Sequence, residues 1–182
     1  MVYQQNFNRI SDLEKNEYEA CIFENCDFSN QLLNGFSFME CEFINCNFSN
    51  ANIVQTAFQT VEFNQCKLMG LRFDLCNPFS LEMEFHDSLL DFSSFSKCNL
   101  KNSKFSNTSL VGVDFSESNL TSVVLNNCNL MNAVFQQTNL EKTDFTSASN
   151  FVIHPEHNKI KKAKFSADGL KGLLIPYDIV VK

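Results

Sequence analysis

Residues 21–50 read CIFEN CDFSN QLLNG FSFME CEFIN CNFSN when they are written in blocks of five. A bulky apolar residue occupies the third place of every block, and Cys opens four of the six blocks. The fourth and fifth places are mostly polar. A short period that repeats without a gap indicates a repeat architecture, so the same frame is expected in the rest of the chain.

The spacing of five extends over most of the chain. Bulky centres recur from Phe23 to Phe73, the frame slips by two residues, and the spacing resumes from Phe85 to Phe145. All 24 of these centres are Phe, Leu or Ile. Chance does not produce such a run, so the centres are predicted to form one continuous core.

The place two residues before each centre also follows the period. It is usually small, as at Cys26, Ala51 and Ser93. Residues two apart on an extended segment point to the same side, so each block turns one large and one small side chain inward. The Asn, Ser, Gly, Gln and Asp residues that follow the centres favour turns. A helix does not fit, because a period of five would wind the apolar stripe around it.

The order of residue types predicts the number of sides. Phe95, Phe115 and Phe135 lie twenty residues apart, and so do Leu100 and Leu120. If a coil has four sides, each side stacks its own residue type, whereas an odd number of sides would mix them. The sequence therefore predicts coils of about 20 residues with four sides.

Blocks such as residues 26–30, CDFSN, resemble the unit of pentapeptide-repeat proteins: small, Asp or Asn, Leu or Phe, polar, variable. The resemblance covers about residues 13–147. It implies an all-β fold, a right-handed quadrilateral parallel β-helix with a filled core. The core ladder is expected to contain Phe23, Phe28, Phe43, Phe48, Phe63, Phe85, Phe95, Phe105, Phe115, Phe135 and Phe145.

The chain is expected to form a single domain, residues 1–182. We expect an N-terminal cap over residues 1–12 and coils over residues 13–147, with the two-residue slip near residues 74–84. An irregular segment and the last coil should follow over residues 148–167. The C-terminal capping or dimerisation element should cover residues 168–182.

Composition and charge narrow the class of protein. The net charge is −7, and the first residues lack both the basic and the apolar region of a secretory signal. No apolar stretch approaches the roughly 20 residues of a membrane span. All eight Cys fall at the small inward position, so we expect buried, reduced core thiols and a cytoplasmic protein.

No residue pattern indicates catalysis. His154 and His157 lie in a short segment that is more typical of a surface loop than of a metal site. Phosphate-binding loops and nucleophile motifs are missing, and the carboxylates fall at outward positions with no apolar pocket. We therefore expect no enzyme, no metal and no cofactor.

The frame slip contains Pro78, which cannot donate a ladder hydrogen bond, and is followed by Phe79. A bulge or short projecting turn is expected there. One interpretation is a tolerated insertion at a corner of a coil, and the other is a contact point that carries Phe79. The first is the simpler.

The C-terminal tail is apolar at helical spacing, although Pro176 should end any helix early. An open coil end exposes an apolar core and an unpaired sheet edge, so the tail should cover it or pair with a second copy. The tail resembles the element by which Qnr-type quinolone-resistance proteins dimerise. The residues expected at a homodimer interface are Leu170, Leu173, Leu174, Ile175, Tyr177 and Ile179.

The resemblance to Qnr-type proteins implies an acidic rod that mimics DNA and binds type II topoisomerases, either DNA gyrase or topoisomerase IV. An acidic surface disfavours direct binding to nucleic acid and suits a basic protein surface. The charge is uneven, since residues 1–91 carry a net −10 and residues 92–182 a net +3. This distribution leaves open an alternative function as a cytoplasmic scaffold or signalling-interaction protein with another partner.

Overall fold

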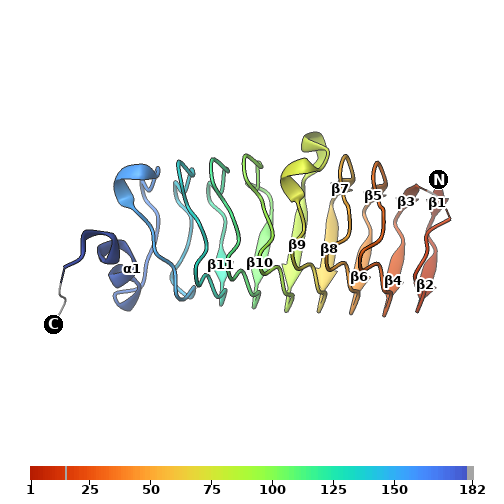
Figure 1. Ribbon diagram of the computed structural model, residues 1–182, viewed down its shortest axis with the longest axis horizontal. Coiled ribbons are helices and arrows are strands. Elements are labelled where there is room, and N and C mark those ends of the chain that lie inside the picture. The colour runs from red at the N-terminus through yellow and green to blue at the C-terminus, as the bar shows by residue number, and fades with distance from the viewer. Residues whose placement is uncertain (15, 180–182) are drawn as a thin grey trace.

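The computed structural model describes residues 1–14 and 16–179 as a straight rod of stacked coils (Figure 1). The N-terminus lies at one end of the rod and α1 (Lys171–Leu174) at the other. All strand pairs between successive coils are parallel. The chain is a right-handed quadrilateral parallel β-helix, as the repeat predicts.

Two sides of the rod carry regular sheets. One sheet contains β1 (Val2–Tyr3), β3 (Glu17–Glu19), β5 (Ser37–Met39) and β7 (Ala57–Gln59). The other contains β2 (Asn6–Asn8), β4 (Ile22–Glu24), β6 (Glu42–Ile44), β8 (Val61–Asn64), β9 (Met83–His86), β10 (Lys104–Ser106) and β11 (Leu125–Asn126). Short 3₁₀ helices cover Phe73–Leu75, Pro78–Ser80, Pro155–His157, Asp168–Leu170 and Ile175–Tyr177. Isolated parallel bridges connect the coils on the other two sides, and they also continue the two sheet-bearing sides toward the C-terminus, as at Asn99–Asn119 and Val124–Asp144.

The register confirms coils of about 20 residues and locates the frame slip. Phe43 pairs with Phe63, and Phe63 then pairs with Phe85, so the coil between them holds two additional residues. Phe85 pairs with Phe105, and the spacing of twenty is restored. At the other end, Phe7 in β2 already pairs with Phe23 across a shorter coil. Residues 1–12, expected as a cap, thus contain strands of the same two sheets.

The core is a column of stacked rings without a lumen. The ring centroid of Phe43 lies 4.8 Å from that of Phe23 and 5.2 Å from that of Phe63, with the rings nearly parallel. Phe38 and Phe48 meet the same ring edge-on from the adjoining sides. Both geometries are favourable for aromatic pairs. All eleven residues of the predicted core ladder are buried.

The corners of the coils need a left-handed backbone. Asn25, Asn45 and Asn50 have φ between 52° and 58°, and equivalent corner positions recur along most of the rod. Asn tolerates this conformation better than most residues, because its short polar side chain can bond locally. In addition, the Asn45 side chain donates to the Asn25 side chain in the next coil at 2.8 Å. The frequent Asn at these places therefore has a backbone cause.

Many of the small inward residues follow one hydrogen-bonding rule. Their hydroxyl or thiol donates to the carbonyl of a bulky centre that lies 23 residues earlier, for example Thr143 to Leu120 at 2.8 Å and Cys46 to Phe23 at 3.3 Å. Across the frame slip the separation becomes 25 residues, as between Ser93 and Leu68 at 2.7 Å. A polar atom inside the core is thereby satisfied without water.

Ser118 and Cys98 donate to carbonyls close in sequence instead, and Ser103 departs from the rule in another way. Its hydroxyl is buried and has no hydrogen-bond partner within the described residues. Counting back 23 residues leads to residue 80, inside the 3₁₀ helix of the frame slip, where the backbone leaves the regular coil. The insertion therefore removes the carbonyl that this hydroxyl would otherwise meet.

Replacing Ser93 and Ser103 by Ala should shift stability in opposite directions. Ser93→Ala removes the bond to the Leu68 carbonyl and leaves the backbone N–H of Leu71, which donates to this hydroxyl at 3.1 Å, without that acceptor. We expect it to lower the free energy of unfolding by about 2 kcal/mol. Ser103→Ala removes only an unsatisfied hydroxyl, so stability should stay constant or rise by up to about 1 kcal/mol. Urea unfolding measures both, and an equal loss in both variants would contradict the rule.

All eight Cys are free and buried. Burial raises the pKa of the Cys41 and Cys128 thiols to about 11 and that of Cys98 to about 12. An ordinary thiol has a pKa of about 8.5. These thiols are therefore neutral and unreactive in the folded rod at physiological pH.

Alkaline pH should destabilise the rod through these thiols. Because their pKa is raised on folding, the stabilisation is fully present below pH 8.5 and is lost as the pH rises toward 11, where the unfolded chain gives up protons that the folded chain keeps. Urea midpoints at pH 7.5, 9 and 10 should fall steadily. A variant with Ala at Cys41, Cys98 and Cys128 should show a flatter pH dependence. An unchanged slope would mean that other groups cause the loss.

Candidate interaction surface

The recesses of the described residues are open and lie at the surface of the rod. They contain no group of three or more His, Cys, Asp or Glu side chains that could hold a metal ion. His154 and His157 stack on each other with ring centroids 5.0 Å apart beside the 3₁₀ helix Pro155–His157. In the described part of the chain no helix has both the length and the apolar character to cross a membrane.

An aromatic side chain that lies outside the repeat frame helps to close the C-terminal end of the core. The five-residue spacing predicts a bulky centre at position 150. That position holds Asn150, which has a φ of 61° and turns the chain. The next residue, Phe151, is only 4% exposed. Its ring lies 5.3 Å from that of Phe145 and 5.6 Å from that of Phe165, measured between centroids. Phe151 thus caps the last rings of the column.

Helix α1 docks directly on this cap. The backbone N–H of Ile153 donates to the carbonyl of Gly172 at 3.0 Å. A Cβ on Gly172 would lie 2.3 Å from the Phe151 carbonyl oxygen and 2.8 Å from its ring. Only glycine permits this approach, so the contact between α1 and the coil end depends on one residue.

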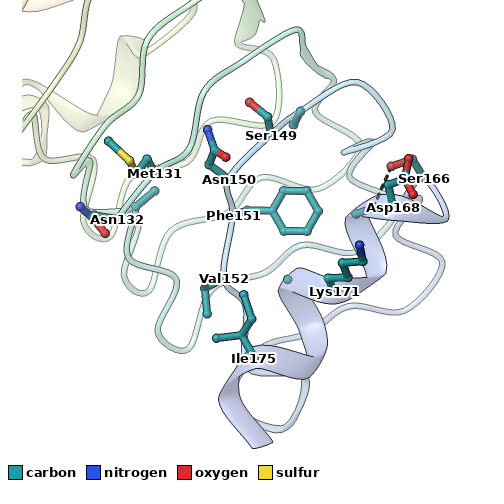
Figure 2. A pocket seen from close by; sticks show the side chains of 14 residues that line it. Met131, Asn132, Ser149, Asn150, Phe151, Val152, Ser166, Asp168, Lys171 and Ile175 are labelled. Atoms are coloured by element: carbon teal, nitrogen blue, oxygen red, sulfur yellow. Dashed lines mark hydrogen bonds between the residues drawn. The ribbon is translucent and has the colours of Figure 1, made fainter. Parts of the chain in front are cut away.

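The junction leaves an open groove of about 740 Å³ between the last coil and the tail (Figure 2). Figure 2 shows Phe151 beside the groove, with Val152 and Ile175 close together on one side and Lys171 on the tail. Met131 lines it from the preceding coil. Apolar and polar groups both line the groove, as is usual for the edge of a protein interface.

The structure divides the six residues predicted for a dimer interface into two groups. Leu173 packs against the core cluster and belongs to the cap, and Leu174 is half-buried. The other four are exposed large apolar residues, with exposed fractions from 45% to 59%: Leu170, Ile175, Tyr177 and Ile179. As expected, α1 ends at Leu174, just before Pro176. The Tyr177 hydroxyl donates to Glu156 at 3.2 Å, which holds the tail against the coils.

Carboxylates stack in register on the acidic half of the rod. Glu42 pairs with Glu62 across β6 and β8, and Glu62 with Glu84 across β8 and β9. Lys104 forms an ion pair with Glu84, and its hydrogen bond holds the pKa of that carboxyl below its usual range. Glu62 has no ion pair among the described residues. Like charges that face each other across a strand pair repel, so this row is suited to an outside cation.

The other half of the same rod is basic. Lys142, Lys161 and Lys162 surround a small recess together with Glu141. Within the described ranges none of these three lysines has an ion-pair partner, whereas Lys164 is paired with Asp144 at 3.1 Å. The uneven charge of the sequence is therefore also segregated along the rod.

Comparison with known proteins identifies the family. The family model described as "Pentapeptide repeat region" matches residues 17–84 and 57–135, and the chain belongs to this family. A search of curated protein sequences finds no significant match.

Solved structures of pentapeptide-repeat proteins have the same fold. The chain resembles a trypsin-treated variant of QnrB1, described as a plasmid-mediated fluoroquinolone resistance protein, with a TM-score of 0.61 and 18% identity over 100% of this chain and 97% of that chain. For full-length QnrB1 the TM-score is 0.59 at 16% identity, covering 97% and 100%. HetL from Nostoc sp. strain PCC 7120, described as involved in heterocyst differentiation regulation, gives 0.61 at 14% identity, covering 91% and 86%. At these identities the likeness shows the fold alone.

Proposed function

We propose that this protein is a non-enzymatic, protein-binding rod whose acidic half occupies a basic surface of a type II topoisomerase, DNA gyrase or topoisomerase IV. The in-register carboxylates of Glu42, Glu62 and Glu84 carry the proposal, because stacked anions at strand spacing suit a surface that evolved to hold DNA phosphates. The fold that the chain shares with QnrB1 supports it. The proposed mode is DNA mimicry by the acidic half, without direct contact between the rod and nucleic acid.

Two rods are proposed to join through the tail as a homodimer. Leu170, Ile175, Tyr177 and Ile179 form an exposed apolar surface next to the groove, whereas the inner face of the tail is already used by the cap. A self-complementary patch at one end of a rod suits a two-fold axis. Eight buried free thiols fit work in the reducing cytoplasm.

A gyrase assay tests the topoisomerase proposal. Purified protein is added to a supercoiling reaction with and without ciprofloxacin, and its affinity for gyrase is measured by biolayer interferometry. We expect micromolar or tighter binding, together with inhibition of supercoiling or protection from the drug. Exchanging Glu42, Glu62 and Glu84 for Gln should weaken binding at least roughly tenfold, whereas Glu141→Gln in the basic half should not. Absence of binding by the unmodified protein would leave the scaffold interpretation.

Light scattering tests the dimer. Ile175→Asp puts a charge on the exposed side of the tail and should halve the measured mass without changing the thermal midpoint. Leu32→Asp, at an exposed apolar residue on a regular coil, is the control and should keep the mass of the unmodified protein. If neither substitution changes a mass that equals one chain, the tail serves only as a cap.

A further inference from the structure

The frame slip presents one aromatic side chain to solvent. Residues 77–81 leave the coil at a corner and rise beyond the neighbouring corners, between β8 and β9 in Figure 1. Phe79 sits on this excursion and is 95% exposed, the highest fraction among the large apolar residues described as exposed. Burial of a Phe side chain contributes about 2 kcal/mol of stabilisation, which Phe79 does not gain in this position. Its exposure therefore needs an explanation.

The excursion is a fixed turn. The Asn77 side chain accepts a hydrogen bond from the backbone N–H of Phe79 at 3.1 Å, and Pro78 occupies the first position of the short 3₁₀ helix. Below it, the backbone N–H of Asn77 donates to the Thr56 carbonyl at 2.9 Å, and the buried Cys76 thiol donates to the Ile53 carbonyl at 3.4 Å. On the other side of the segment, the backbone N–H of Glu82 donates to the Phe58 carbonyl at 3.2 Å. Both ends are thus tied to the rod, which reduces the entropy that a partner would have to remove.

The rod is locally weakened where the excursion leaves it. The sheet that contains β1, β3, β5 and β7 ends at β7, and the 3₁₀ helix Pro78–Ser80 of the insertion contacts β7 from the next coil. Among the described residues, the buried hydroxyl of Ser103 lacks a partner for the same reason. An unsatisfied buried group in a native structure calls for an explanation, and functional sites are where such local costs persist.

The other exposed Phe, Phe92, has a structural explanation that Phe79 lacks. The Phe92 ring lies against the backbone of Gly112, where a Cβ would come within 2.8 Å of it. Phe92 therefore covers a corner of the next coil. Leu32 is exposed but sits within the regular bridge pattern, opposite Asn52.

We propose that Phe79 is the anchor by which the rod holds its protein partner, an inference that rests on the proposed function. The partner surface must carry an apolar pocket for one aromatic ring, flanked by cationic groups that face the carboxylates of the acidic half. Beside Phe79, a polar recess of about 300 Å³ lined by Gln59, Glu82 and Lys101 supplies the rim of the contact. An aromatic anchor in an apolar pocket with a polar rim is the usual composition of a binding hot spot.

Binding of gyrase to single-residue variants tests the anchor. Phe79→Ser should weaken affinity about 50-fold, and Phe79→Leu, which keeps an apolar side chain, should weaken it less than tenfold. Leu32→Ser is the matched control in the same half of the rod and should bind as the unmodified protein does. All variants should keep the thermal midpoint, because Phe79 contributes nothing to the core.

The outcomes separate the two proposals. If the unmodified rod binds gyrase and Phe79→Ser binds equally well, the anchor is wrong and the topoisomerase proposal stands. If Phe79→Ser and Leu32→Ser weaken binding equally, the loss reflects general apolarity and the anchor is also wrong. If the unmodified rod does not bind gyrase, both proposals fall.

Discussion

Phe43→Ala should lower the free energy of unfolding by about 4 kcal/mol, the range measured for large-to-small changes in well-packed cores. The ring is fully buried, is stacked between Phe23 and Phe63, and is met edge-on by Phe38 and Phe48. Coils above and below hold the cavity open, because their spacing is fixed by the parallel ladders. Collapse around the missing ring is therefore limited, and most of the cavity cost should remain.

Ile44→Ala is the matched control for this prediction. Ile44 is the next residue along β6, and its half-buried side chain points to the outside of the rod. We expect it to cost less than about 1 kcal/mol. Equilibrium urea unfolding followed by circular dichroism gives both values. A larger loss for Ile44→Ala than for Phe43→Ala would mean that the inward and outward faces are assigned the wrong way round.

The period of five was sufficient to predict the fold, since it repeats in every coil. Side-chain alternation fixes which residue of each block points inward, and the alternation of Phe with Leu fixes four sides. The two-residue slip could also be predicted, because the spacing of five places a centre at position 83 and the next Phe centre is Phe85. The pairing of Phe63 with Phe85 confirms that reading.

The ends and exceptions of the rod could not be read in this way. Phe151 lies one residue out of frame, and nothing local shows that it folds over the last rings. A glycine can adopt many backbone conformations, so the sequence alone does not indicate a role for Gly172. Its role depends on close contact with Phe151, some twenty residues away. Similarly, the Ser103 hydroxyl lacks a hydrogen-bond partner among the described residues because of the insertion in the preceding coil. Each of these features is a long-range contact that a repeat pattern does not contain.

The predicted dimer interface in the C-terminal tail also could not be fully derived from the sequence pattern. Helical spacing predicts one apolar set of Leu170, Leu173, Leu174 and Tyr177. A hydrophobic pattern does not say which members face a core and which face solvent. The structure assigns Leu173 to the cap and leaves Leu170 exposed. Capping and dimerisation can therefore be separated by substitutions on opposite sides of the same short element.

Gly172→Val should detach the tail from the coil end. The new Cβ would overlap the Phe151 carbonyl oxygen, a backbone atom that cannot move aside without disturbing the last coil. Overpacking of this kind costs about 1–3 kcal/mol, and we expect the upper end because the bond between Ile153 and Gly172 would also break. The cap of Phe151 would then lose the helix that covers it.

Hydrogen exchange and limited proteolysis give the measurement. In the Gly172→Val variant the Ile153 amide should exchange faster and trypsin should cut after Lys171 more readily, while the amide of Phe63 in β8 keeps its protection. Lys171→Val, the same side chain at the neighbouring exposed position, is the control and should change the stability by less than about 0.5 kcal/mol. Ile175→Asp should leave the Ile153 amide protected, since it acts on the outer side of the tail. If Gly172→Val exchanges as slowly as the unmodified chain, the tail does not depend on close approach at this glycine, and the separation of cap from dimer surface is wrong.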